Sequence, residues 1–329
     1  MATTVTHVVD PDSGAGFDYD SLFDWEVGEQ GDLTGVRDEI AVAKCRCTGG
    51  TADATAVTIY SWTTSATQYI KIWTDPAENY RHNGTYQTGN KYRLELAPVT
   101  NLLIWNTEYT RLDGLQIYAT GTTYGNNCCT PGGASVTSVH ISNCIFRVVS
   151  GNTKGPYGID CTSALNPGAV FYIWNCVFQD FTGYTGVHAG ISSGPTGSTW
   201  YVYNCTAYNC KNPYYVSAGT VYWKNCGAAA STGTAFTGGT QTTCSTDTPT
   251  FVSTTGTYDL HLQSGDTTWI GAATNLYNDA ALAFQTDIDL QDRGGASASW
   301  DIGADEYVAA VSDISISISE SLAFAEALD

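Results

Sequence analysis

The chain has 329 residues, of which 43% are hydrophobic and only 14% charged, and its formal net charge is −19. This composition is sufficient for a packed core and excludes disorder over most of the length. The acidic surplus lies at the two ends, because residues 41–278 carry eleven acidic and eleven basic side chains. No basic surface is predicted, which argues against nucleic-acid binding. We expect the acidic ends to keep the protein soluble. The alternatives are that they prevent end-to-end association of neighbouring molecules or bind a cation.

The first segment, residues 1–45, contains a predicted short helix at residues 18–26. Asp20 or Ser21 can cap this helix, and Leu22 and Trp25 share one of its faces. The start of the segment lacks the basic residues and apolar run of an export signal, and no stretch of the chain is long and apolar enough to span a membrane. We expect the segment to cap the first turn of the fold or to attach it to a partner, since an uncovered first strand invites edge pairing.

Most of the chain after this helix is typical of short strands separated by turns rich in Gly, Asn, Thr and Pro. β-Branched and aromatic residues are abundant, and they favour strands. The candidate strands of the first third are residues 40–43, 56–62, 69–73, 92–96, 102–105 and 115–118.

An Asn-Cys pair follows an apolar strand four times in the middle of the chain. The pairs are Asn143-Cys144, Asn175-Cys176, Asn204-Cys205 and Asn225-Cys226. An earlier Asp113-Gly114 fits the same frame, and the successive spacings are 30, 32, 29 and 21 residues. A fixed motif at variable spacing indicates a solenoid, in which stacked strands keep their register while the loops differ in length.

Stacking explains both residues of the pair. In a parallel β-helix the turns lie about 4.8 Å apart, so equivalent side chains form ladders. Asparagine at a bend tolerates unusual φ and can hydrogen-bond to the next asparagine, while an inward cysteine behaves as a small hydrophobe. Metal binding is the rival interpretation of the cysteines, although Cys45-Arg46-Cys47 and Cys128-Cys129 are too closely spaced for a zinc knuckle. Without an export signal, the eleven cysteines are not expected to form disulfides.

The sequence therefore predicts an all-β fold, a single-stranded right-handed parallel β-helix over residues 46–307. The end of this region has irregular turns that include Asp287 to Arg293 and Asp301-Ile302-Gly303-Ala304-Asp305-Glu306-Tyr307. This ending is similar to that of right-handed β-helix proteins of the pectate-lyase-like superfamily, and the likeness covers roughly residues 40–307. The opening at residues 19–26 resembles virion or prophage-encoded members of that group.

The resemblance implies either a groove that cleaves acidic polysaccharides or a structural role. Hydrolysis needs paired carboxylates, and lyase chemistry needs a cation and a base. Residues 136–230 contain only two acidic side chains, Asp160 and Asp180. Asp180 could form a lyase pair with Lys211, and His188 could be a general base. The alternative for His188 is a turn or surface position.

The Asp-rich ending could bind Ca²⁺, because calcium takes several oxygen ligands. Its acidic residues are Asp287, Asp289, Asp292, Asp301, Asp305 and Glu306, of which the first three are the candidate ligands. They do not match an EF-hand pattern. The alternative is that the acids of this ending accept hydrogen bonds from turn amides and from Arg293. No other cofactor is expected.

The C-terminal tail, residues 308–329, alternates strictly and then becomes helical. Its apolar side chains include Ile314, Ile316 and Ile318 on one strand face and Leu322 on a short helix. A strand with one apolar face must pack on something, so the tail contacts either its own rod or a partner.

We expect a structural or adhesive virion protein, such as a capsid decoration, fibre or spike component, located on the surface of a particle assembled in the host cytoplasm. Homo-oligomerisation, with a trimer favoured, other virion proteins and surface polysaccharide are the expected partners, without nucleic acid or membrane. The 21 Tyr and 9 Trp suit carbohydrate binding or protein interfaces equally. The alternatives are a polysaccharide depolymerase, as lyase or glycoside hydrolase, and a secreted surface or matrix protein.

Overall fold

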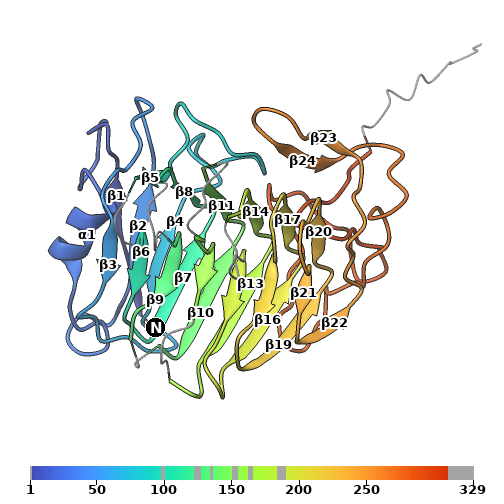
Figure 1. Ribbon diagram of the computed structural model, residues 1–329. Coiled ribbons are helices and arrows are strands. Elements are labelled where there is room, and N and C mark those ends of the chain that lie inside the picture. Colours follow the sequence, from blue (N-terminus) through green and yellow to red (C-terminus); the bar gives the residue numbers. More distant parts are fainter. Residues whose placement is uncertain are drawn as a thin grey trace, which may run out of the picture.

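The chain forms a right-handed parallel β-helix in the computed structural model (Figure 1). Parallel strands make up three long sheets, and a typical turn contributes one strand to each of them. This architecture confirms the predicted fold class. The structure describes residues 2–97, 101–121, 127–133, 136–149, 155–161, 166–183 and 190–309.

Sheet 1 is the longest of the three sheets. Its nine strands, in spatial order, are β1 (Thr3–Val9), β2 (Glu39–Cys45), β4 (Ile70–Trp73), β7 (Tyr109–Asp113), β10 (Ser138–Ser142), β13 (Val170–Trp174), β16 (Thr199–Tyr203), β19 (Thr220–Lys224) and β22 (Thr240–Thr242). The register is continuous, since each strand pairs in parallel with the next along the axis.

Sheets 2 and 3 complete each turn. The strands of sheet 2 are β5 (Leu94–Leu96), β8 (Gln116–Ala119), β11 (Ile145–Val148), β14 (Val177–Gln179), β17 (Thr206–Tyr208) and β20 (Gly227–Ala229). The strands of sheet 3 are β3 (Val57–Ile59), β6 (Leu103–Trp105), β9 (Cys129–Pro131), β12 (Ile159–Asp160), β15 (Ile191–Ser193), β18 (Tyr214–Val216) and β21 (Phe236–Thr237). Each of the six candidate strands of the first third overlaps a strand of one of the three sheets, so those predictions are confirmed.

The helix α1 (Leu22–Glu29) lies at the N-terminal end of the β-helix (Figure 1). Ser21 caps it by accepting a 3.0 Å hydrogen bond from the backbone N of Asp24, as the sequence predicts. Leu22 and Trp25 are buried in the same core as the first turns, and the Trp25 ring stacks on Trp62 at 5.4 Å. The helix thus covers apolar side chains that would otherwise face solvent.

The four asparagines lie at one corner, between sheets 1 and 2. Their φ angles are positive, at 52°, 51°, 46° and 53° for Asn143, Asn175, Asn204 and Asn225. Asparagine is one of the few residues that adopts this left-handed conformation at modest cost. The amide of Asn175 donates to Asn143 at 3.2 Å, and that of Asn225 donates to Asn204 at 3.0 Å. The ladder is interrupted between Asn175 and Asn204.

The predicted alignment of Asp113-Gly114 with the Asn-Cys pairs is wrong by one residue. Ser142 pairs with Asp113 in the sheet, so Gly114, with φ of +73°, occupies the asparagine position. Asp113 still continues the ladder, because its Oδ1 accepts a 2.8 Å hydrogen bond from Asn143.

The cysteines that follow the asparagines are fully buried inside the β-helix. These are Cys144, Cys176, Cys205 and Cys226. Lys224 pairs with Thr242 in sheet 1, which places Cys244 next in this stack, after a Thr243 that also has a positive φ. All eleven cysteines are free thiols, and ten of them are buried.

After Ser245 the chain leaves the sheets, and in the described chain β22 is the last strand of sheet 1. Residues 246–309, here called the C-terminal wrap, run along the outside of the β-helix (Figure 1). The wrap contains an antiparallel hairpin of β23 (Phe251–Ser253) and β24 (Asp259–Leu262). The irregular closing turns expected near residues 258–307 therefore lie against the sides of the rod and add no strand to the three sheets in the part described.

Candidate functional site in the C-terminal wrap

The wrap is attached to the asparagine corner by hydrogen bonds. Asn175 donates to the carbonyl of Thr286 at 2.7 Å, and Asn225 donates to that of Thr274 at 2.8 Å. Asn204 donates to the carbonyls of two further wrap residues, Asp301 at 3.1 Å and Gly303 at 3.2 Å. The asparagine side chains thus satisfy irregular backbone that would otherwise be buried without partners.

Arg293 enters where the asparagine ladder is interrupted. Its side chain is fully buried and donates from Nη2 to the carbonyl of Ala304 at 2.7 Å. Its Nη1 contacts Oε2 of Glu306 at 2.8 Å. Burial raises the pKa of Glu306 to about 7, although the guanidinium opposes this shift. The acids of the ending therefore accept bonds from Arg293 and from amides, as the second sequence interpretation proposed.

The wrap also covers the outer face of sheet 2. Ile145 and Val177 point outward there and are buried in a cluster with Phe251 and Trp269. Gly227 makes this close contact feasible, because a Cβ at that position would collide with the Trp269 ring. The chain itself therefore covers this part of the outer face of sheet 2.

Part of sheet 1 keeps an outward row of aromatic rings. Tyr172, Tyr201 and Tyr222 stack with centroid distances of 5.5 and 5.4 Å and interplanar angles of 17° and 10°. The faces of neighbouring rings therefore cover one another.

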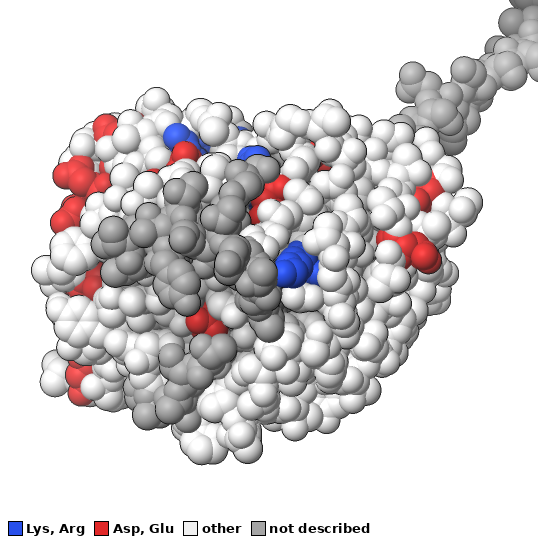
Figure 2. Space-filling view, viewed as in Figure 1, with Lys and Arg blue, Asp and Glu red and all other residues white. Residues whose placement is uncertain are grey.

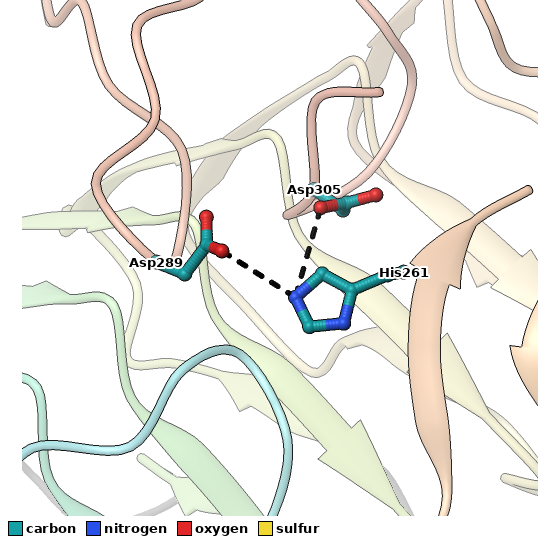
Figure 3. Close-up of side chains that lie close together, drawn as sticks. All are labelled: His261, Asp289 and Asp305. Carbon is teal, nitrogen blue, oxygen red and sulfur yellow. Dashed lines mark ion pairs between the residues drawn. The ribbon is translucent and has the colours of Figure 1, made fainter. Parts of the chain in front are cut away.

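The hairpin brings one histidine to the surface of the wrap. Leu260 and Leu262 of β24 face the buried cluster, and the alternate residue His261 faces two carboxylates from later parts of the wrap (Figure 3). The Nε2 atom of His261 lies 3.6 Å from Oδ2 of Asp289 and 3.9 Å from Oδ1 of Asp305. The other ring nitrogen, Nδ1, lies 2.5 Å from Oδ1 of Asp259.

An open cleft of about 310 Å³ adjoins this histidine. Its lining residues are Val252, His261, Leu262, Asp289, Gln291, Asp305, Glu306, Tyr307 and Val308. The three facing side chains are nevertheless mostly covered, with exposed fractions of 20% for His261, 14% for Asp289 and 8% for Asp305.

Charges within this cluster are strongly coupled. Burial alone would lower the pKa of His261, but the neighbouring Asp289, Asp305 and Asp259 raise it to about 10. Burial raises the pKa of Asp305 to about 6, against the attraction of His261. Burial and the adjacent Asp289 raise the pKa of Asp287 to about 9. Imidazole and carboxylates at these distances could bind a cation or transfer protons.

Among the predicted catalytic residues, Asp180 is held by contacts that stabilise the fold. It is fully buried, its φ is +69°, and it turns the chain at the far end of sheet 2. Its carboxylate accepts from Asn209 at 2.7 Å and Tyr258 at 2.8 Å, and it lies 3.4 Å from Nε of Arg147. Both hydrogen bonds reach Oδ1, whereas Oδ2 is buried in the ion pair with Arg147 and makes no hydrogen bond.

Of the other catalytic candidates, Lys211 lies on the turn next to Asp180 and Asp160 belongs to another sheet. Asp160 belongs to sheet 3, where it accepts a 2.9 Å hydrogen bond from Asn127. Lys211 lies one turn further along, and its backbone N donates to the carbonyl of Phe181 at 2.8 Å. His188 is outside the described residues.

The calcium candidates are divided among different roles. Asp287 is buried and accepts backbone hydrogen bonds from Asp289, Gln291 and Glu306. Asp292 is exposed and accepts from the backbone of Gly294. Only Asp289 of the three faces His261 Nε2, together with Asp305.

Sequence reasoning missed His261 and Asp305 as a pair. The alternation Asp259-Leu260-His261-Leu262 signals a strand with one polar face, but it does not reveal which carboxylates face it. The tail contacts proposed for Ile314, Ile316, Ile318 and Leu322 lie outside the described residues. No helix in the described ranges has the length and apolar character needed to cross a bilayer. Figure 2 shows a mostly uncharged face, with acidic side chains gathered towards the end formed by α1.

Comparisons of this chain with protein-family models, with curated proteins and with solved structures found no match. The parallel β-helix follows from the strand pairing itself, whereas the likeness to pectate-lyase-like and virion proteins stays a prediction.

Proposed function

We propose that the chain is a structural or adhesive β-helix rod of a virus particle, a decoration, fibre or spike component. The observation that carries this proposal is the C-terminal wrap on the outer face of sheet 2. A depolymerase of the resembled type needs an open groove along stacked strands, and on sheet 2 apolar wrap side chains such as Trp269 cover the outer face. The candidate Asp180 is fully buried, accepts hydrogen bonds from Asn209 and Tyr258 and forms an ion pair with Arg147, which suits a rigid scaffold better than catalysis.

The tyrosine row on sheet 1 is the surface proposed for partner contact. Tyr172, Tyr201 and Tyr222 cover one another's faces and are partly buried against the wrap cluster of Leu276, Leu282 and Trp300, so a partner would meet mainly ring edges. A sugar ring that needs an open aromatic face finds little of it here, whereas a second protein surface can pack on ring edges. We infer a homo-oligomer with a trimer favoured, alongside other virion proteins, at the particle surface. Surface polysaccharide is a weaker candidate ligand.

Sedimentation velocity of the full chain tests this interface. We expect a trimer, and we expect Tyr201→Lys to shift the distribution towards monomer because it places a charge within the stacked row. Tyr60→Lys is the matched control, since Tyr60 is 44% exposed. A monomer at every concentration, or equal behaviour of the two variants, would contradict the proposed interface.

One observation favours the depolymerase alternative. The cleft beside His261 contains carboxylate oxygens of Asp289 and Asp305 that lie within 4.8 Å of each other and of the imidazole. Retaining glycosidases keep their two carboxyl groups about 5–5.5 Å apart. The cleft is lined by the wrap, so such an activity would act outside the groove that the resemblance implies.

Release of reducing ends or of unsaturated sugars from a panel of acidic polysaccharides separates the two functions. The structural proposal predicts no release by the full chain. Release that Asp289→Asn abolishes and Asp292→Asn preserves would establish the depolymerase. Asp292 is the suitable control because it is an exposed carboxylate of the same segment.

A further inference from the structure

We propose that His261, Asp289 and Asp305 bind one divalent transition-metal ion, such as Zn²⁺ or Mn²⁺, at the cleft in the C-terminal wrap. This site is independent of the proposed virion role, since it rests only on contacts within the wrap. Its three candidate ligand atoms lie within 4.8 Å of one another (Figure 3).

The first argument is that the histidine nitrogen lacks a hydrogen-bond partner. Nε2 of His261 is buried and makes no hydrogen bond, and its neighbours Asp289 and Asp305 are 3.6 and 3.9 Å away. Hydrogen bonds between N and O span about 2.7–3.2 Å, so these separations are too long. Oδ2 of Asp289, the oxygen that faces Nε2, accepts one hydrogen bond, from Gln291 at 2.8 Å, and keeps a further lone pair. A shared ion can bind Nε2 and both carboxylates at once, because ligand atoms about 2.0–2.1 Å from a tetrahedral metal lie roughly 3.4 Å apart.

The second argument comes from the opposite side of the imidazole. Nδ1 of His261 lies 2.5 Å from the Asp259 carboxylate, which fixes the ring and favours the tautomer with the proton on Nδ1. A metal ion would displace the proton from Nε2, which faces Asp289 and Asp305, and would bind the lone pair left there. A carboxylate that orients a ligating histidine in this way is a recurring feature of metal sites.

The surroundings of Nε2 leave room for an ion. Gly84 packs against Nε2 with φ of +84°, and a Cβ there would collide with the ring nitrogen. The cleft opens to solvent beside Asp289 and Asp305, so water can complete the coordination of an ion that has three protein ligands.

The ligand set determines the class of metal. Calcium takes six to eight oxygen ligands and magnesium retains several waters, whereas imidazole nitrogen suits first-row transition metals. One imidazole and two carboxylates therefore favour Zn²⁺ or Mn²⁺ over Ca²⁺. Such an ion would join the hairpin strand β24 to two later parts of the wrap. Asp305 already strengthens this connection by accepting a 2.6 Å hydrogen bond from the backbone of Leu262.

Equilibrium dialysis of the chelator-treated full chain against Mn²⁺ and Zn²⁺, followed by elemental analysis, tests the site. Mn²⁺ is the more selective probe, because thiolates favour Zn²⁺ and the chain has eleven cysteines. We expect one Mn²⁺ per chain, a higher Tm with the ion, and much weaker retention of Ca²⁺. Asp289→Asn should weaken Mn²⁺ binding at least about 10-fold.

Two further variants complete the test. Asp292→Asn removes an exposed carboxylate of the same segment and should bind Mn²⁺ like the unaltered chain. Asp259→Asn leaves the three ligands in place and should weaken binding about 10- to 100-fold through loss of histidine orientation, which covers the case in which Asp289→Asn misfolds. Failure of the unaltered chain to retain Mn²⁺ or Zn²⁺, or equal binding by Asp289→Asn and Asp292→Asn, would overturn the proposal. None of these outcomes depends on the oligomeric state or on polysaccharide cleavage.

Discussion

Arg293 donates from Nη2 to Oδ1 of Asn175 at 3.3 Å, a contact between residues 118 positions apart in the chain. The same guanidinium bonds to Glu306 and to the carbonyl of Ala304. A single buried side chain thus connects the wrap, its ending and the asparagine corner.

Replacing Arg293 by Met should release the wrap. The substitution leaves Glu306 buried without its partner and several carbonyls unsatisfied, at a cost of about 3–5 kcal/mol. Arg293→Lys should recover little of this, because an ammonium group cannot reproduce the fork of guanidinium bonds. Urea unfolding measures the loss, and Arg111→Met, a substitution on the outer face of sheet 1, should cost less than about 1 kcal/mol. Equal losses from the two Met variants would refute the role assigned to Arg293.

Two substitutions at a corner asparagine can separate the effect of the backbone conformation on stability from the effect of the side-chain hydrogen bonds. Asn175→Gly keeps access to the positive φ and loses only the side-chain bonds, whereas Asn175→Ala loses both. We therefore expect Ala to be less stable than Gly by about 1 kcal/mol, the cost of a left-handed conformation for a residue with a Cβ. Chemical denaturation of both variants gives this difference, and a more stable Ala variant would exclude a left-handed conformation at residue 175.

Contact between Gly227 and Trp269 can be tested by a double-mutant cycle. Gly227→Ala should displace the Trp269 ring and cost about 1–3 kcal/mol, as overpacking does elsewhere. In a Trp269→Ala background the same change should cost much less, because the colliding ring is absent. Additive effects on the free energy of unfolding would mean that the wrap does not pack on β20 in solution.

Glu26 makes the stability of the N-terminal end depend on pH. Burial raises its pKa to about 7 from the usual 4.5, despite hydrogen bonds from Tyr60 and Trp62. The folded chain then binds this proton more tightly than the unfolded chain, so the free energy of unfolding falls as pH rises from 4.5 to 7. Above the raised pKa this contribution is constant.

The variant Glu26→Gln removes that titration. Relative to the variant, the unaltered chain should lose on the order of 2 kcal/mol between pH 4.5 and 7, a value reduced for partial screening by solvent. Urea unfolding at several pH values measures the difference, and parallel pH profiles for the two proteins would show that Glu26 does not titrate in this range.

Thiol reactivity tests the interior stack. Ten cysteines are buried and only Cys244 is partly exposed, so a thiol reagent should modify at most Cys244 rapidly in the folded chain. Burial also raises the pKa of the Cys128 thiol to about 12, which removes the reactive thiolate there. All eleven should react in denaturant, and rapid native modification of Cys176 or Cys205 would contradict the inward orientation.

The β-helix could be predicted because its signal is local and repeated. Asn143 and Asn175 sit at a bend that requires a positive φ, and each is followed by a residue that points inward, so the same pair recurs on each turn. The sequence pattern does not reveal the repeat in turns where another residue takes the place of the corner asparagine. Thr243 replaces the asparagine before Cys244, and Gly114 takes the same position in an earlier turn.

The wrap could not be predicted in the same way, because its contacts are remote and lack a period. Asn204 bonds to the carbonyl of Asp301, 97 positions later, and nothing near either residue indicates the other. The His261 cluster is equally non-local, since Asp289 and Asp305 come from separate irregular stretches. The Asp-rich ending drew attention to Asp289 but also to Asp292, which faces solvent.

The wrap has a consequence for how the rod comes apart. In solenoids each repeat contacts only its neighbours, so turns can peel away singly from an end. Here one continuous strip of backbone is bonded to Asn175, Asn204 and Asn225 on three successive turns. Opening any of these turns disturbs the strip that the others also bind, which couples their melting into a concerted transition and protects the C-terminal end from fraying.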